Sequence, residues 1–248
     1  SIVQKKIEQG LTLENPVYLK MLRQGNAKAL YSLSPTFEYF QRTDEGLVIG
    51  RGNYRKLLEF LSKTNFQYEI IDETVAPKLD PKIKLVGLKL REYQKGIPEE
   101  IVQSAQGIIK LGTGWGKTIC ALKMIDLLRT KTLIILPRNN ILEQFKKEIE
   151  EYYRITPGII KSKKFEVNDI TIASFSTLKK RDLNSIKNEF GLIIVDECHA
   201  AISEACLNVL SKFNSRYLYG MTATPEKPED DGRTQALFFT YGDLLVDK

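Results

Sequence analysis

A glycine-rich stretch at residues 112–118, Gly-Thr-Gly-Trp-Gly-Lys-Thr, offers the first residues that could do chemistry. It follows a short apolar run, GIIKL, and precedes a helix-length segment, ICALKMIDLLR. Between a strand and a helix, glycines let backbone amides surround phosphate oxygens, and the helix start adds partial positive charge. Lys117 can reach the terminal phosphates and Thr118 can ligate Mg²⁺. Although Leu111 stands where a further glycine is usual, we predict a nucleotide-phosphate site rather than a turn that binds nothing.

Two adjacent carboxylates end another apolar run, LIIVDECHA, about 80 residues later. At the tip of a strand they would face the phosphate loop across the sheet edge. We expect Asp196 to hold Mg²⁺ through its water shell, and Glu197 to orient the attacking water. The alternative is a pair of surface acids. The spacing favours hydrolysis, with Lys117, Asp196 and Glu197 as catalytic residues.

The cysteines and the single histidine raise the question of a metal site. Cys198, His199 and Cys206 lie close in sequence, but three ligands without a fourth nearby make zinc a poor interpretation. We expect His199 to make a polar contact in the nucleotide cleft instead. Three cysteines without framework spacing favour a reducing compartment, so we expect the protein in the cytoplasm.

The elements that must position these residues are short, fully apolar runs alternating with amphipathic segments of helix length. Strands that are apolar on both faces belong in a parallel sheet covered by helices. The sequence therefore predicts an α/β domain with its ligands beyond the carboxyl ends of the strands. The expected strands are residues 107–111, 132–137, 170–174, 192–196 and 216–221.

The first 80 residues predict a separate small α+β unit. We expect a helix from Pro16 to Arg23, a hairpin turning at Asp44-Glu45, a helix capped by Asn53, and a strand over residues 66–72. Prolines and polar residues around residues 76–82 are typical of a linker. We therefore expect domains at residues 1–80 and 81–248.

Charge and hydropathy narrow the classes of partner. The net charge of +6 comes from the middle of the chain, because residues 81–190 hold 21 basic and 12 acidic side chains. Such a surface could attract a polyanion, or could be a set of solvated lysine-rich helices. The sequence has neither an apolar window of membrane-spanning length nor a signal-peptide pattern, so we expect no membrane partner.

Over roughly residues 85–248 the chain resembles superfamily-2 helicases of the DEAD/DEAH-like kind, here with a DECH box. The motifs fall in order along the chain: Leu90–Gln94, Thr113–Thr118, Pro137–Gln144, Ala173–Leu178, Asp196–His199 and Thr222–Pro225. The resemblance implies a RecA-like P-loop domain with a parallel sheet flanked by helices. Two departures are Trp115, where other members carry small residues, and Arg138, where threonine is usual.

The resemblance also implies roles for individual residues, with ATP and Mg²⁺ as cofactors. Gln94 would read the adenine edge and Arg91 would lie against the base. Trp115 would lie close enough to the nucleotide to report its binding. The expected cofactor-binding residues are Arg91, Gln94, Thr113, Gly114, Trp115, Gly116, Lys117, Thr118 and His199, with Thr118 and Asp196 as the metal ligands.

Other motif positions would contact nucleic acid or couple it to the nucleotide. Hydroxyl groups and backbone amides at helix starts can hold phosphates without reading bases. Each such residue alone would be an ordinary strand-end or capping residue, and only the motif series gives it a role. The expected contacts are Arg138, Ser174, Ser176 and Thr177, and the expected coupling residues are Thr222 and Thr224.

The resemblance places a second RecA-like domain, with an arginine finger, after residue 248, so we expect a fragment of a longer chain with little turnover of its own. Residues 1–80 resemble the front domain of phage-type helicases of the UvsW- and XPB-like branch, which engages branched or distorted DNA. Its basic candidates are Lys20, Arg23, Lys28, Arg51, Arg55 and Lys56. The near-neutral balance of residues 1–80, 11 basic against 10 acidic, argues against strong affinity for DNA by this unit alone.

The leading hypothesis is an ATP-dependent DNA helicase or translocase that acts on single-stranded, forked or branched DNA. The alternatives are an RNA helicase, the motor subunit of a restriction system, and a binding module that uses nucleotide as a switch. We expect a monomer, located in the host cytoplasm if the protein is phage-encoded.

Overall fold

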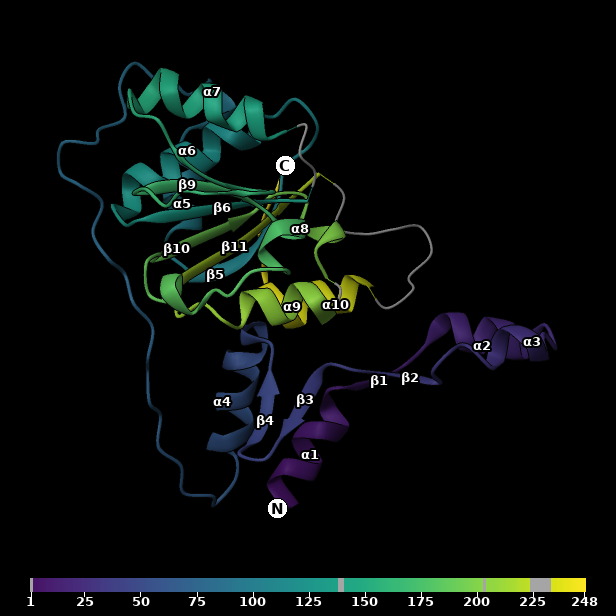
Figure 1. Cartoon of the computed structure of the whole chain (residues 1–248). Helices are drawn as coiled ribbons and strands as arrows, with labels where there is room; N and C mark the ends of the chain where they lie inside the picture. Colours follow the sequence, from purple (N-terminus) through teal and green to yellow (C-terminus); the bar gives the residue numbers. More distant parts are fainter. Residues whose placement is uncertain (1, 138–140, 203, 224–232) are drawn as a thin grey trace.

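A computed structural model describes residues 2–137, 141–202, 204–223 and 233–248. Its larger part is an eight-stranded sheet in the order β12-β5-β11-β10-β6-β9-β7-β8, in which only β8 runs antiparallel to its neighbour (Figure 1). The fold is thus the predicted α/β domain with a mostly parallel sheet. The strands are β5 (Gln106–Lys110), β6 (Thr132–Leu136), β7 (Gly158–Lys161), β8 (Lys164–Phe165), β9 (Ile170–Ser174), β10 (Leu192–Val195), β11 (Tyr217–Thr222) and β12 (Leu244–Asp247).

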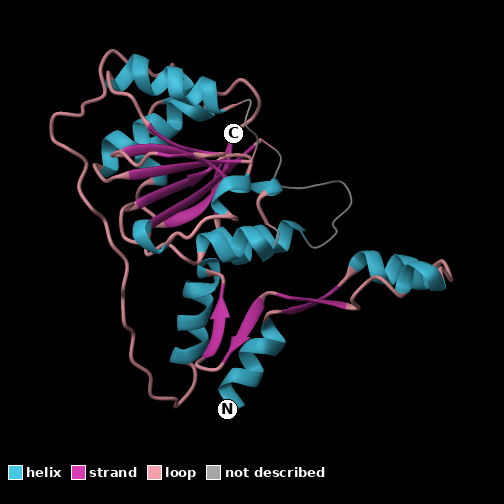
Figure 2. Ribbon diagram, in the orientation of Figure 1, coloured by secondary structure: helices cyan, strands magenta, loops and turns pink. Residues whose placement is uncertain are grey.

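Helices cover both faces of this sheet (Figure 2), and its inner strands contribute side chains to two separate cores. Ile194 packs with the helices α6 and α7, whereas its neighbour Ile193 packs with α8, α9 and α10. Burial on both faces explains why the strands read as continuous apolar runs. The helices are α5 (Ile97–Ile101), α6 (Lys117–Leu128), α7 (Leu142–Tyr153), α8 (Phe175–Leu178), α9 (Glu204–Leu210) and α10 (Arg233–Tyr241), with 3₁₀ turns η2 (Glu92–Gln94), η3 (Asn184–Ile186) and η4 (Cys198–Ala200).

The N-terminal unit consists of short elements around two small antiparallel ladders. The predicted helix is α2, whose start is capped by the Asn15 side chain accepting from the amides of Val17 and Tyr18. The predicted hairpin at Asp44-Glu45 joins β3 to β4, so both predicted elements are confirmed. The elements are α1 (Ile2–Gly10), β1 (Thr12–Glu14), α2 (Pro16–Arg23), α3 (Ala27–Leu30), β2 (Thr36–Glu38), β3 (Phe40–Thr43), β4 (Gly46–Ile49), η1 (Arg51–Asn53) and α4 (Tyr54–Ser62).

Two predictions for this unit are wrong. Residues 66–72 form no strand, and Phe66 and Ile70 are about half exposed, at 48% and 52%. A strand needs a neighbour for its backbone groups, and the described residues bring none alongside. Asn53 precedes α4 as predicted, but its carboxamide does not cap the helix; it donates to the carbonyls of Gly50 and Phe239.

The segment after α4 rejoins the sheet domain before its first helix. The amide of Val75 donates to the Asn214 carbonyl at 2.7 Å, and the amide of Leu79 donates to the Arg129 carbonyl at 3.0 Å. The Leu79 side chain is buried in the core beside α6. The connecting chain is therefore fixed along the sheet domain from Val75 onward.

The N-terminal unit is joined to the amino-terminal end of the sheet by a close contact. The Arg51 guanidinium donates to the Gln106 side chain at 2.8 Å and to the carbonyls of Ser215 and Arg216 at 2.6 and 2.7 Å. A Cβ on Gly52 would lie 2.2 Å from the Phe238 carbonyl oxygen, so only glycine allows this approach. Burial lowers the pKa of Arg51, yet the three oxygen atoms that accept hydrogen bonds from its guanidinium favour the charged form.

Candidate active site

The residues predicted to do chemistry meet at one edge of the sheet. Strands β5, β11 and β10 are neighbours and run parallel, so their carboxyl ends lie side by side. Residues 112–118 follow β5, Asp196 follows β10, and Thr222 ends β11. The topology thus brings the glycine-rich loop, the acidic pair and the threonine together, as expected for ligand sites in parallel sheets.

The loop at residues 112–118 has the backbone that phosphate binding requires. Gly114 and Gly116 have positive φ angles of 80° and 96°, which side chains rarely allow. A Cβ on Gly116 would also lie 2.5 Å from the Gln94 side-chain nitrogen. The helix α6 begins immediately after, at Lys117, so its first amides and its dipole face the loop.

Polar contacts connect the loop to the acidic pair and to β11. The Lys117 ammonium lies 3.1 Å from one Glu197 carboxylate oxygen, and His199 Nδ1 lies 3.3 Å from the other. The same His199 nitrogen lies 2.9 Å from the Thr222 hydroxyl. Glu197 itself has a left-handed φ of 45°, an uncommon conformation for a residue other than glycine. Three predicted motifs therefore form one continuous chain of contacts.

Asp196 differs from its neighbour because it is buried and incompletely satisfied. Its side chain is 4% exposed, and its Oδ1 atom has no hydrogen-bond partner among the described residues. Burial, and then the charge of Glu197, raises the pKa of Asp196 to about 6, and Lys117 opposes the rise. A buried carboxylate oxygen without a partner fits Mg²⁺, which prefers such ligands. The residues at hand thus suit the cation that Thr118 and Asp196 were predicted to hold.

The element expected to read the base lies against the phosphate loop. The Gln94 side chain donates to the Trp115 carbonyl at 2.6 Å and accepts from the Arg91 amide at 2.8 Å. The rings of Tyr93 and Trp115 meet edge to face, with centroids 5.6 Å apart. Arg91 donates to the Tyr93 hydroxyl at 2.7 Å. Tyr93 was not among the predicted site residues, although its position in Leu90–Gln94 beside the loop could have indicated it.

Two of the residues expected to contact nucleic acid meet at the start of helix α8, where Ser174 caps the helix and Thr177 is bonded to it. The Ser174 hydroxyl accepts from the Thr177 amide at the start of α8, and both side chains are buried. The Thr177 hydroxyl also accepts from the Ser162 amide at 2.9 Å. Ser176 is exposed and lies 3.2 Å from Ser174, hydroxyl to hydroxyl. The remaining predicted residues, Arg138 and Thr224, lie outside the described residues.

The cysteines and the histidine lie in different surroundings in the part that the structure describes. No group of three or more His, Cys, Asp or Glu side chains there could hold a metal ion. Cys198 and Cys206 are buried in the core beside α9 and α10 and form no disulfide. None of the described helices has the length and apolar character that a membrane crossing demands.

A parallel sheet with this loop and acidic pair at its carboxyl edge defines a RecA-like P-loop domain of the helicase type. The family model for "Type III restriction enzyme, res subunit" matches residues 87–227, and the chain belongs to this family. Membership confirms the resemblance to superfamily-2 helicases. The family implies the use of ATP and an ATPase or helicase type of enzyme.

Individual relatives agree with this assignment. The chain is 32% identical over 197 residues to the DNA 3'-5' translocase XPB2 of Sulfurisphaera tokodaii, covering 79% of this chain and 43% of that protein. It is 33% identical over 175 residues to a probable helicase of Escherichia phage T5, covering 69% of this chain and 38% of that protein. The chain thus spans less than half the length of these relatives.

Solved structures share the fold. The UvsW helicase of bacteriophage T4 matches 98% of this chain and 93% of that chain, with a TM-score of 0.67 at 16% identity. The SWI2/SNF2 ATPase core of Sulfolobus solfataricus, solved in complex with double-stranded DNA, matches 63% of this chain and 36% of that chain, with a TM-score of 0.52 at 20% identity. The first likeness extends over the N-terminal unit as well as the sheet domain.

Proposed function

We propose that this chain is the nucleotide-binding part of an ATP-driven DNA motor that unwinds or remodels single-stranded, forked or branched DNA. The contact series from Lys117 through Glu197 and His199 to Thr222 carries the proposal. It joins the phosphate loop to the motif that couples nucleotide to polynucleotide in the family. Names of relatives such as DNA 3'-5' translocase and helicase support DNA as the polymer.

The ion pair at the site suggests how nucleotide would change it. The Lys117 ammonium pairs with the Glu197 carboxylate at 3.1 Å. The terminal phosphates of ATP would attract Lys117 more strongly, because they carry more negative charge than one carboxylate. Glu197 would then be released to orient a water, while Asp196 and Thr118 hold Mg²⁺. The hydrogen bond between His199 and Thr222 would pass the change to β11.

The division of the chain into two domains and a second motor domain form part of the proposal. Residues 1–80 would be an accessory domain that engages DNA, and residues 81–248 would be the first motor domain. A second RecA-like domain of the same parent chain would supply the arginine finger, so residues 1–248 alone would turn over ATP very slowly. We place the protein in the cytoplasm, as a monomer.

The test is ATP hydrolysis by the longer parent chain with single-stranded, forked and duplex DNA and with RNA at one salt concentration. We expect strong stimulation by forked or single-stranded DNA and little by RNA. In a Glu197→Gln variant, hydrolysis should fall at least about 100-fold while ATP binding persists. The control is Glu151→Gln, which changes an exposed carboxylate on α7. Stimulation by RNA alone, or fast multiple turnover by residues 1–248, would contradict the proposal.

A motor subunit of a restriction system is a second candidate, because the matching family is described by such a subunit. The same assay separates the two. A restriction motor would need its specific recognition sequence for stimulation, whereas the leading proposal expects stimulation that depends on DNA structure and not on sequence.

A further inference from the structure

The positive charge of the N-terminal unit is concentrated in one small part of it. Residues 15–35, hereafter the head, comprise α2, α3 and their flanking loops and contain Lys20, Arg23 and Lys28 but no acidic residue. The rest of residues 1–80 holds 8 basic and 10 acidic side chains. The near-neutral total of the unit therefore hides a head of charge +3, which is where a polyanion would be attracted.

The other basic candidates of this unit are engaged elsewhere. Arg51 is held by the sheet domain, Arg55 lies 3.6 Å from the Asp243 carboxylate, and the Lys56 ammonium lies 5.8 Å from the centre of the Phe239 ring. All three contacts hold the unit against α10 and the amino-terminal end of the sheet. These side chains thus form a joint with the sheet domain, whereas Lys20, Arg23 and Lys28 on the head are exposed.

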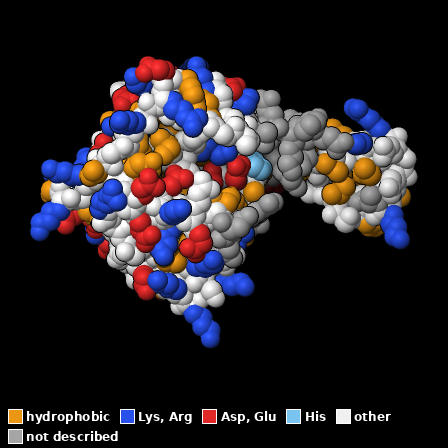
Figure 3. All heavy atoms as spheres, turned by 90° about the horizontal axis from the view of Figure 1, so that it is seen from above, with side chains coloured by type: hydrophobic (Ala, Val, Ile, Leu, Met, Phe, Trp, Pro, Cys, Tyr) orange, Lys and Arg blue, Asp and Glu red, His pale blue; other side chains and the backbone are white. Residues whose placement is uncertain are grey.

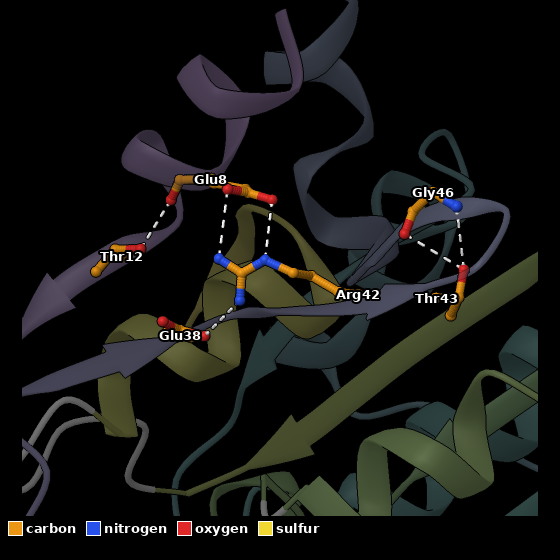
Figure 4. Close-up of polar contacts among 6 residues, drawn as sticks. All are labelled: Glu8, Thr12, Glu38, Arg42, Thr43 and Gly46. Atoms are coloured by element: carbon orange, nitrogen blue, oxygen red, sulfur yellow. Dashed lines mark hydrogen bonds and ion pairs between the residues drawn. The ribbon is translucent and has the colours of Figure 1, made fainter. Parts of the chain in front are cut away.

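The head is carried on an arm that separates it from the body. The arm is the ladder of β1 with β2, whose three residue pairs run from Thr12 opposite Glu38 to Glu14 opposite Thr36 (Figure 1). At its root, Arg42 pairs with Glu8 at 3.1 Å and with Glu38 at 3.4 Å, which ties α1 to the ladder (Figure 4). The role of Arg42 is therefore structural, because its ion pairs connect α1 to the base of the arm.

The surface of the head combines cations with exposed apolar groups. Tyr31 is 97% exposed and Leu22 is 52% exposed, and neither is covered by the body. A groove of about 400 Å³ is lined by Pro16, Leu19, Lys20, Arg23 and Gln24. On the face shown in Figure 3, Lys and Arg side chains surround hydrophobic ones on the head, and no acidic side chain is visible there.

Aromatic rings beside cations are the chemistry that binds unpaired nucleotides, because the ring stacks on a base while the cations neutralise phosphates. We propose that the head is the part of the N-terminal unit that contacts DNA: Lys20, Arg23 and Lys28 bind the phosphate backbone, and Tyr31 stacks on an unpaired base at a fork. This inference rests on the proposed DNA motor and adds where its accessory domain touches the substrate.

The test is binding of residues 1–248 to a fluorescent forked DNA, measured by anisotropy at several salt concentrations without nucleotide. A double variant Arg23→Ala, Lys28→Ala should weaken binding about tenfold and make the slope of log affinity against log salt shallower by one or more. The matched control is Lys5→Ala, Lys6→Ala, which removes two exposed cations from α1 of the same unit. The control should bind nearly as well as the unaltered chain.

A second measurement isolates the stacking. A 2-aminopurine at the fork junction should be quenched on binding, and Tyr31→Ala should abolish the quenching and weaken binding about fivefold or more, whereas Tyr31→Phe should preserve both. Unchanged binding by the head variants, equal losses in head and control variants, or no binding of forked DNA at all would overturn the proposal.

ATP hydrolysis by the parent chain separates this inference from the motor. If the head variants lose fork binding but keep stimulation by single-stranded DNA, both proposals are supported. If stimulation by DNA is absent in the unaltered parent, the motor proposal fails whatever the head binds. If stimulation is normal and the head variants bind forks as the unaltered chain does, only the inference about the head fails.

Discussion

The two ends of the central sheet differ in how completely their polar groups are satisfied. At the carboxyl end, Asp196 has a buried oxygen without a partner among the described residues, and Glu197 has a left-handed backbone. At the amino end, Arg51 is half-buried, and its guanidinium is bonded to Gln106, Ser215 and Arg216. The same strands β5 and β11 contribute to both ends.

This difference distinguishes a binding site from a joint. A buried polar group without a partner costs free energy, and strained residues persist only where the surroundings hold them, so both tend to mark ligand sites. A charged side chain that donates hydrogen bonds to several acceptors, as Arg51 does, holds two parts of a chain together instead. We therefore expect substitutions at the carboxyl end to act mainly on the binding and hydrolysis of nucleotide. Substitutions at the amino end should act mainly on the free energy of unfolding.

The largest effect is expected for Lys117→Ala. This variant should lose at least about 100-fold in affinity for Mg·ATP or in hydrolysis, because the terminal phosphates lose their main cation. Calorimetric titration with Mg·ATP measures the binding. The control is Lys123→Ala, which removes a lysine of the same helix α6 that pairs with Asp126 at 3.0 Å. Equal losses in the two variants would indicate a general effect on α6 and not a phosphate contact.

The joint should be most sensitive to Gly52→Ala. The added Cβ would lie 2.2 Å from the Phe238 carbonyl oxygen and 2.5 Å from the Gly242 amide nitrogen, and neither backbone atom can move cheaply. We expect a loss of about 3 kcal/mol in the free energy of unfolding, measured by urea denaturation. Gly10→Ala is the control, since its Cβ would meet nothing within 4 Å. Similar stability of the two variants would contradict a close joint.

Arg51→Ala should cost somewhat less, about 2 kcal/mol, because it leaves three acceptors without their donor. The matched substitution is Arg42→Ala, which removes an arginine that is 57% exposed and paired with Glu8 and Glu38. Exposed ion pairs contribute little to stability because solvent screens them. Urea denaturation of both variants checks the order, and an equal cost would mean that Arg51 is not an anchor.

The smallest effect is a gain in stability for Asp196→Asn in the presence of EDTA. The pKa of Asp196 is raised to about 6 in the folded chain, so the ionised form destabilises the fold above that pH. The penalty disappears as pH falls below the ordinary value of 3.8. Asparagine should therefore add about 1 kcal/mol at pH 7.5 and nothing near pH 3.5, by thermal unfolding at both pH values. A loss of stability at pH 7.5 would show that the carboxylate supports the fold.

The sequence was most informative where one physical constraint acts alone. Strands buried on both faces must be apolar throughout, so β5, β6, β9, β10 and β11 could be located, and the loop at residues 112–118 needs glycines in any such fold. β7, β8 and β12 were missed; they lie at or next to the edges of the sheet, and β8 has only two residues. The sheet edge then brings Lys117, Glu197, His199 and Thr222 together as expected.

Predictions failed where the outcome depends on a distant partner. Residues 66–72 have the composition of a strand, but composition cannot show whether another strand lies alongside. The side chain of Asn53 suits a helix cap, yet it donates to the Phe239 carbonyl of the sheet domain. The side chain of Arg51 suits a DNA phosphate, yet it donates to the Ser215 carbonyl of the same domain. The type of a polar residue shows what it can bond, and only the fold shows which partner is near.

Hydrogen–deuterium exchange of residues 1–248 with and without Mg·ADP tests the contrast between the two ends most directly. The account predicts that amides of residues 112–118 and 196–199 exchange more slowly once nucleotide is bound. Amides of residues 50–53 and 106–108 should already be protected and should not change. Unchanged exchange at residues 112–118 under saturating nucleotide, or fast exchange at residues 50–53, would contradict it.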